Sequence, residues 1–235
     1  MFEAVLFDLD GVIIDSNKGI TDYWQALASS YQISLTPSDF ERYIYGCPAR
    51  ETLDLLFTRL TSAEKEAALL QLISYESNLR YTEIPGAMAF LRALREHGIP
   101  TALVTSGEQW KVDIIREQLG IGEFFTEFIT ADQIRNGKPD PECYLLAAQR
   151  LNKPAAKCVV FEDAVSGVAA ATAAGAFCIG VQKGNMVPPL VSAGAGLVVP
   201  DFEQVQIELS ESQTLSGGPQ FDLKPVLEGV VLQRY

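Results

Sequence analysis

The chain has 235 residues, 48% of them hydrophobic and 20% charged, which is typical of a globular protein with one large domain or a core carrying an inserted domain. A formal net charge of −12 without a visible basic stripe argues against nucleic acid as a partner. The sequence has no apolar run of about eighteen residues and no secretory signal pattern, so we expect no membrane association.

The cysteines and the single histidine limit the kinds of site. Cys47, Cys143, Cys158 and Cys178 are scattered without a Cys-x-x-Cys pair, which predicts reduced thiols in a cytoplasmic protein and disfavours a zinc site. His97 precedes a glycine in a predicted helix C-terminus, where a cation is favourable. With only one histidine, histidine triads and histidine-rich metal sites are excluded.

The first part of the chain combines one strand with a helical module. Residues 1–6 form a short apolar run that predicts a buried strand. Apolar residues then recur at helical spacing through most of residues 20–80. Thr36 and Thr61 stand where helices are predicted to begin, the second in a capping box with Glu64. We therefore expect a helical cap domain of residues 16–81, inserted after the first strand.

The rest of the chain alternates short apolar strands with helices. The predicted strands are residues 100–104, 127–130, 158–161, 176–181 and 196–199, and the predicted helices are 87–97, 109–119, 141–151 and 167–174. This alternation predicts an α/β fold with a doubly wound, Rossmann-like parallel sheet, built from residues 1–15 and 82–235. After Gln204, weak alternation and a turn at 216–219 predict a peripheral hairpin.

Polar residues follow three of the predicted strands. The first strand leads into Asp8 and Asp10, the second into Thr105 and Ser106, and the third into Glu162 and Asp163. In open α/β sheets, ligands bind beyond the carboxyl ends of the strands, so these side chains are expected around one crevice. Asp8 and Asp10 stand two residues apart and can face the same site if the chain there is extended.

The predicted crevice is rich in oxygen ligands. Asp8, Asp10, Glu162 and Asp163 suit a hard cation, and Mg²⁺ is the usual choice where phosphate is the substrate. Lys138 and the Thr105 hydroxyl can hold the oxygens of a transferring phosphoryl group. Each feature alone has an ordinary interpretation, such as an acidic turn or a solvated lysine. Their coincidence in this order favours a site.

Four segments resemble the motifs of the haloacid dehalogenase-like hydrolases. They are Phe-Asp-Leu-Asp-Gly at 7–11, Val-Thr-Ser-Gly at 104–107, Gly-Lys-Pro at 137–139 and Val-Phe-Glu-Asp-Ala at 160–164. The helical module matches the position of the cap in the β-phosphoglucomutase-like branch. Residues 128–131 and the glycine at 167 look most like the sugar and polyol phosphatases of that family.

The resemblance implies a mechanism and a set of site residues. Asp8 would be the nucleophile that forms an aspartyl-phosphate, and Asp10 would act first as acid and then as base. Mg²⁺ would be bound by Asp8, the Asp10 carbonyl and Asp163, with Glu162 supporting them. Further residues with implied roles are Thr105 and Lys138 for phosphoryl charge and Ser106 and Gly107 for substrate binding. Arg50, in the loop at 45–50 of the helical module, is a separate candidate, because its guanidinium can donate to substrate oxygens.

Several alternatives stay open at this point. A sugar phosphate mutase uses the same two aspartates, but mutases of the family carry a histidine where this chain has Ile20, which favours hydrolysis. A dehalogenase needs no second acid, and a binding module that lost activity would lack a motif. Arg50 can equally be an exposed arginine, and Lys18 and Trp110 are weaker candidates. We expect a monomer whose partner is a small phosphate ester.

Overall fold

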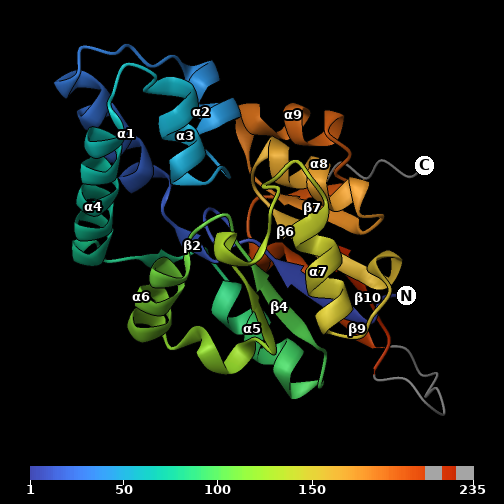
Figure 1. Cartoon of the computed structure of the whole chain (residues 1–235). Coiled ribbons are helices and arrows are strands. Elements are labelled where there is room, and N and C mark those ends of the chain that lie inside the picture. The colour runs from blue at the N-terminus through green and yellow to red at the C-terminus, as the bar shows by residue number, and fades with distance from the viewer. Residues whose placement is uncertain (210–218, 226–235) are drawn as a thin grey trace.

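The computed structural model describes residues 1–209 and 219–225, and its centre is one sheet of six parallel strands (Figure 1). The strands are β1 (Ala4–Phe7), β4 (Thr101–Val104), β5 (Glu127–Ile129), β6 (Cys158–Glu162), β7 (Phe177–Val181) and β8 (Leu197–Val199). Their order is β5-β4-β1-β6-β7-β8, with every neighbouring pair parallel. The predicted parallel α/β sheet is confirmed, and β1 lies between β4 and β6.

Helices cover both faces of the sheet. They are α5 (Ala87–Glu96) and α6 (Gln109–Leu119) on one face and α7 (Glu142–Arg150), α8 (Val165–Ala173) and α9 (Val187–Ser192) on the other. Along β1, Val5 and Phe7 pack with the first group, whereas Ala4 and Leu6 pack with the second. Successive strand residues point to opposite faces, so a strand covered on both sides reads as one apolar run.

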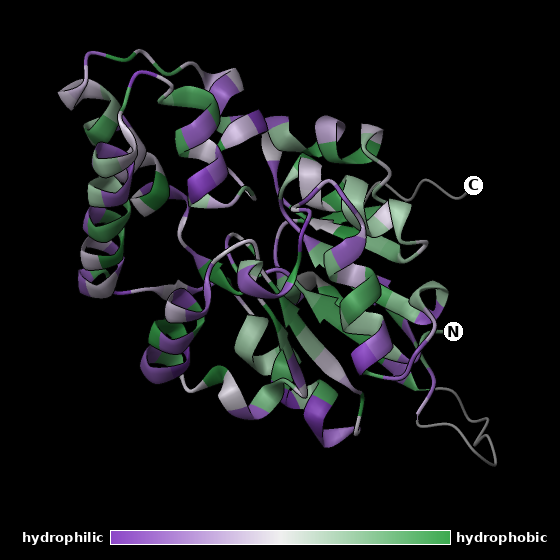
Figure 2. Ribbon diagram, viewed as in Figure 1, coloured by the Kyte–Doolittle hydropathy of each residue, from purple (hydrophilic) through white to green (hydrophobic). Residues whose placement is uncertain are grey.

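The helical module forms a layer of its own at one end of the sheet (Figure 1). It contains α1 (Asn17–Ser30), α2 (Pro37–Tyr43), α3 (Ala49–Leu56) and α4 (Ser62–Asn78), which enclose a separate hydrophobic cluster. Hydrophobic and hydrophilic residues alternate along α4 (Figure 2), and Leu69 and Leu72 are among those that it buries. Thr36 and Thr61 begin α2 and α4 as predicted, each in a capping box. We call α1–α4 the helical layer.

Two short strands, which the sequence pattern did not predict, connect the helical layer to the sheet. β2 (Ile14–Asp15) and β3 (Thr82–Glu83) pair antiparallel, so the two chain crossings run side by side. Short 3-10 helices complete the connections at Ile121–Phe124, Ala131–Gln133, Ala155–Lys157, Gly184–Met186 and Phe202–Gln204. Across the described ranges, no helix is long and apolar enough to cross a membrane. All four cysteines are free.

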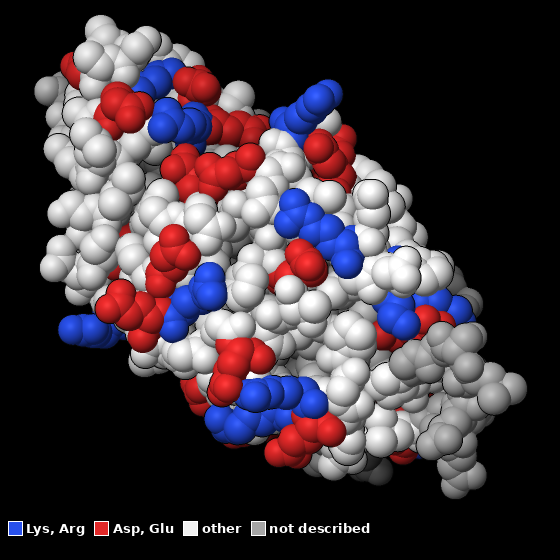
Figure 3. All heavy atoms as spheres, turned by 60° about the horizontal axis from the view of Figure 1, so that its bottom comes forward, with Lys and Arg blue, Asp and Glu red and all other residues white. Residues whose placement is uncertain are grey.

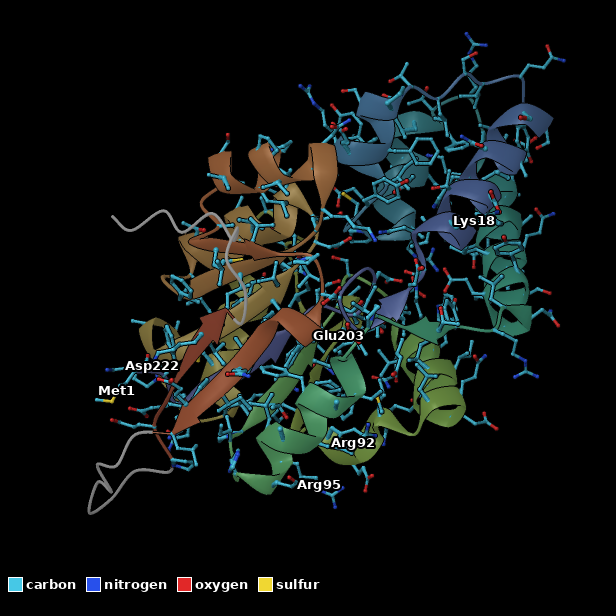
Figure 4. All side chains as sticks on the ribbon, turned by 180° about the vertical axis from the view of Figure 1, so that it is seen from behind. Met1, Lys18, Arg92, Arg95, Glu203 and Asp222 are labelled. Atoms are coloured by element: carbon cyan, nitrogen blue, oxygen red, sulfur yellow. The ribbon has the colours of Figure 1, made fainter. Side chains whose placement is uncertain are left out.

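The C-terminal segment contains the predicted hairpin strands, β9 (Val205–Leu209) and β10 (Phe221–Pro225), paired antiparallel. Residues 216–218 of the predicted turn lie outside the described residues. Phe221 is fully buried and its backbone bonds with that of Phe2. In Figure 4, Met1 and Asp222 lie together, and the amino group of Met1 is 3.3 Å from the Asp222 carboxylate. The hairpin therefore contributes to the hydrophobic core as well as to the periphery.

Candidate active site

Two neighbouring strands, β1 and β6, bring the predicted acidic residues together. Asp8 follows β1, while Glu162 ends β6 and Asp163 follows it. Carboxylate oxygens of these three residues lie within 4.8 Å of one another, and all three side chains are buried. The order β4-β1-β6 explains this proximity, because adjacent parallel strands end at the same edge.

Lys138 inserts its ammonium group between two of these carboxylates. Its Nζ donates to Asp8 Oδ1 and to Glu162 Oε1, both at 2.6 Å, and to the Val104 carbonyl at 3.2 Å. Burial lowers the pKa of Lys138, but Asp8 and Glu162 outweigh that effect and hold the pKa above its usual value. The site therefore contains a permanent, buried positive charge next to Asp8.

Glu162 has little freedom to ligate an ion directly. Its Oε1 also accepts from the Tyr144 hydroxyl at 2.7 Å, and its Oε2 accepts from the backbone N–H groups of Asp163 and Ala164. Both oxygens are thus engaged by the protein. Glu162 was predicted to support the metal-binding residues, and in this geometry it holds Lys138 and the Asp163 backbone.

Asp8 and Asp163 are the side chains that best fit a cation. Asp163 accepts one hydrogen bond, from Asn17 Nδ2 at 3.3 Å. Burial raises the pKa of Asp8 to about 7 despite Lys138, and burial together with Asp8 and Glu162 raises the pKa of Asp163. Crowded, buried carboxylates of this kind are stabilised by a bound cation with a preference for oxygen ligands.

Gly11 allows the chain to pass close to Asp163. Its φ of +73° lies in the left-handed region, and a Cβ there would stand 2.0 Å from Asp163 Oδ2. Any other residue would carry both a strained backbone and a collision with the carboxylate. The glycine of the first motif is therefore needed for the shape of the site.

Asp10 points into a second buried network. Its Oδ1 accepts from Ser16 Oγ at 2.5 Å and lies 2.8 Å from Lys111 Nζ. Lys111 Nζ is also 3.2 Å from Glu76 Oε2, and Glu76 accepts from the Tyr81 hydroxyl at 3.1 Å. The metal role predicted for Asp10 concerns its backbone carbonyl, whereas its carboxylate, the predicted acid and base, is held here by Ser16 and Lys111. Because Glu76 belongs to α4, the network joins Asp10 to the helical layer.

The sequence interpretation missed Lys111 and Glu76, although a signal existed. Glu76 continues the buried stripe of Leu69 and Leu72 on α4, and Lys111 lies among the buried residues of α6 with Ile115. A charged residue within an apolar stripe marks a buried polar contact. Which partner it meets depends on how the two helices pack, which no local pattern reveals.

The predicted residues after β4 bridge the sheet and the helical layer. The Thr105 hydroxyl oxygen accepts from the Gly107 N–H at 2.9 Å, and Ser106 Oγ donates to the Gly46 carbonyl at 2.7 Å. Gly46 lies between α2 and α3 with φ +71°, and a Cβ there would stand 3.0 Å from Ser166 Oγ. This close approach seats the loop of the helical layer against the sheet edge.

A pocket lies between the sheet edge and the helical layer. It is lined by Asp8, Asp10, Asn17, Ile20, Trp24, Ile44, Tyr45, Gly46, Cys47, Ala49, Arg50, Glu66, Leu69, Leu72, Ile73, Glu76, Thr105, Ser106, Gly107, Glu108, Trp110, Lys111 and Asp163. Lys138 reaches the pocket only through its contact with Asp8. The structure thus brings the other predicted side chains around one cavity, except Glu162, which lies behind Asp163.

The weaker candidates divide clearly. Arg50 lines the pocket, with its guanidinium 3.1 Å from Glu66 and 3.4 Å from Glu108. Trp110 also lines it and donates to Glu108 at 3.0 Å. Lys18 does not: its side chain is 86% exposed on α1 and pairs with Asp22 (Figure 4). Over the face in Figure 3, basic and acidic side chains are interspersed, as expected for surface charges.

Comparisons with known proteins identify related sequences and a similar fold. A family model described as a haloacid dehalogenase-like hydrolase matches residues 2–175. The chain is 36% identical over 177 residues to a phosphorylated carbohydrates phosphatase of Thermotoga maritima, covering 74% of this chain and 82% of that protein. It is 30% identical over 223 residues to a β-phosphoglucomutase of Bacillus subtilis, covering 88% and 93%. A hydrolase structure from Pseudomonas syringae superposes with a TM-score of 0.75 at 25% identity, covering 86% and 94%.

Proposed function

Since the chain belongs to the haloacid dehalogenase-like hydrolases and is a phosphoric monoester hydrolase, we propose that it is a Mg²⁺-dependent phosphatase of small sugar or polyol phosphates. The observation that carries the proposal is the buried Asp8 carboxylate, which faces the pocket and is held at 2.6 Å by Lys138. Lys138 orients one oxygen of Asp8 and leaves the carboxylate accessible from the pocket. That is the arrangement a carboxylate nucleophile needs.

The proposed reaction has two steps on Asp8. A carboxylate oxygen of Asp8 bonds to phosphorus while the ester oxygen leaves and takes a proton from Asp10. Asp10 then removes a proton from water, whose oxygen bonds to phosphorus while the bond to Asp8 breaks and phosphate is released. Ser16 and Lys111 hold the Asp10 carboxylate for both transfers.

Charge on the phosphoryl group requires positive partners. Asp8, Asp163 and the backbone carbonyl of Asp10 would hold Mg²⁺, which supplies positive charge next to the phosphoryl oxygens when it is bound. Lys138 supplies a second positive charge, and the Thr105 hydroxyl and the backbone N–H of Ser106 are proposed donors at the sheet edge, where Gly107 also lines the pocket. Glu162 keeps Lys138 and Asp163 in place.

The helical layer is proposed to act as the cap, with its boundaries at residues 16 and 81. Its loop at Gly46 contacts Ser106, so the pocket is separated from bulk solvent when this contact is made. Arg50 lies at the rim of the pocket and is proposed as a donor to the leaving group. Neither role requires a second copy of the chain, and we propose a monomer.

The test is release of inorganic phosphate from a panel of sugar and polyol phosphates, with Mg²⁺ or with EDTA. Release that needs Mg²⁺ and is lost in Asp8→Asn supports the proposal, and Asp15→Asn, an exposed acid nearby, is the matched control. Conversion of β-glucose 1-phosphate to glucose 6-phosphate with little free phosphate would identify a mutase instead. If Mg²⁺ binds but no ester reacts, the chain is a binding module.

A further inference from the structure

The part of the pocket built by the helical layer is mainly apolar. It contributes six large aliphatic or aromatic side chains, namely Ile20, Trp24, Ile44, Leu69, Leu72 and Ile73. The sheet side adds Trp110, which is half-buried. A leaving group that extends from phosphorus toward the helical layer would therefore contact hydrocarbon over much of its surface.

Polar groups in this part of the pocket are largely committed to other residues. The Tyr45 hydroxyl is 2.7 Å from Thr21 Oγ1, and Cys47 Sγ donates to the Arg42 carbonyl. Glu76 is already occupied by Lys111 and Tyr81. A substrate hydroxyl buried here would lose its hydrogen bonds to water and would find few free partners in return, which is costly.

Charge in the same region disfavours a second phosphate. Of the pocket residues that the structure describes in the helical layer, Arg50 is the only basic one. Its guanidinium already faces two carboxylates, Glu66 and Glu108, so the local sum of these three charges is negative. A distal phosphate would have to compete with both carboxylates for one arginine.

We propose that the preferred leaving group is poor in hydroxyls and carries no second anionic group. Deoxygenated sugars and cyclic alcohols have this chemistry. The inference rests on the proposed phosphatase function and narrows its substrate class. It also separates this pocket from one that holds a sugar bisphosphate.

The first test compares esters that differ only in hydroxyls. Glucose 6-phosphate and tetrahydropyran-2-ylmethyl phosphate share the ring oxygen and the CH₂–O–phosphate group, but the second has no ring hydroxyls. We expect kcat/KM to be about tenfold higher for the second ester, mainly through a lower KM. Equal or better turnover of glucose 6-phosphate would overturn the inference and leave the phosphatase intact. If no phosphate is released from these two esters or from the esters of the panel, the proposed function itself is refuted.

The second test adds a phosphate to the leaving group and replaces an apolar side chain of the pocket. Fructose 1,6-bisphosphate should be at least about tenfold poorer in kcat/KM than fructose 6-phosphate, and equal turnover would contradict the inference. Ile73→Ser should lower kcat/KM for the tetrahydropyranyl ester several times more than for glucose 6-phosphate. Leu70→Ser is the control, because Leu70 lies on the same helix with 62% of its surface exposed and does not line the pocket. If Ile73→Ser lowers kcat/KM equally for both esters, the apolar wall does not select the leaving group and the inference is wrong.

Discussion

The floor and the roof of the pocket hold their charges in opposite ways. In the floor, formed by the sheet edge and Lys138, the side chains of Lys138 and Glu162 are each 1% exposed and are joined at 2.6 Å. In the roof, formed by the helical layer, Arg50 and Glu66 are each more than half exposed, at 59% and 55%. The same type of ion pair is therefore buried on one side and solvated on the other.

This difference assigns phosphoryl transfer to the floor and the choice of leaving group to the roof. Removing one partner of a buried pair leaves an uncompensated charge and is strongly destabilising, whereas an exposed pair contributes little. The floor can therefore change only at a large cost to both fold and reaction. Apart from Glu76, which is buried against Lys111, the pocket side of the roof consists of apolar contacts and solvated charges, so it can change substrate preference while the phosphoryl site stays intact.

The largest effect is expected from Lys138→Met, which breaks the floor. Asp8 and Glu162 would lose their common cation, so we expect kcat to fall at least about a hundredfold and the free energy of unfolding to fall by about 3–5 kcal/mol. Phosphate release and urea unfolding measure the two effects. Lys183→Met, at an exposed lysine, is the control and should change neither. Full activity in Lys138→Met would contradict the proposed phosphoryl site.

The next effect concerns the connection between floor and roof. Lys111→Met would leave Asp10 and Glu76 without their cation, so we expect a loss of about 3 kcal/mol in unfolding free energy and about tenfold in kcat. Adding Glu76→Gln should restore part of the stability, because the remaining buried charge is reduced. The exposed Lys18→Met is the control. Strictly additive losses in the double variant would show that Lys111 and Glu76 are not coupled.

The sequence predicted the floor better than the roof for a physical reason. Asp8, Thr105 and Glu162 stand at strand ends, and parallel strands meet at one edge, so their proximity follows from topology. The strand boundaries and the capping boxes of α2 and α4 follow from local periodicity and local hydrogen bonds. These features depend on short segments or on one general rule of sheet architecture.

Contacts between helices could not be predicted in the same way. The pairing of Lys111 with Glu76 depends on how α6 meets α4, and the pairing of β2 with β3 depends on where the chain enters and leaves the helical layer. Glu162 has the right chemistry for a metal ligand, but Lys138 and Tyr144 occupy its Oε1. Residue type and strand position predicted which side chains lie near the pocket, whereas the ion pairs and hydrogen bonds that each one makes depend on how the elements pack.

A moderate effect is expected from pH acting on the floor. The pKa of Asp8 is about 7 in the folded, ion-free chain and 3.8 in an ordinary carboxyl, so its stabilising contribution is complete below about pH 4 and is lost as the pH rises toward 7. The raised pKa of Asp163 acts in the same direction. Mg²⁺ competes with these protons. Saturating Mg²⁺ should therefore raise Tm by about 5 °C near pH 8 and by much less near pH 5.

Thermal unfolding with Mg²⁺ and with EDTA at the two pH values measures this difference. Asp163→Asn should remove most of it, and the exposed Asp15→Asn should retain it. A Mg²⁺ effect that is equal at both pH values would show that these carboxylates do not hold the ion.

The smallest effect is expected in the roof, from Arg50→Ala. The pairs of Arg50 with Glu66 and Glu108 are largely solvated, so the free energy of unfolding should change by less than about 1 kcal/mol. As a rim donor, Arg50 should affect binding and not the chemical step, so KM should rise about threefold while kcat stays constant. Steady-state kinetics on a neutral leaving group separates the two terms. A large fall in kcat would contradict the division between floor and roof. Arg50 could then stabilise the transferring phosphoryl group only by leaving Glu66 and Glu108, and it would act with the residues of the floor.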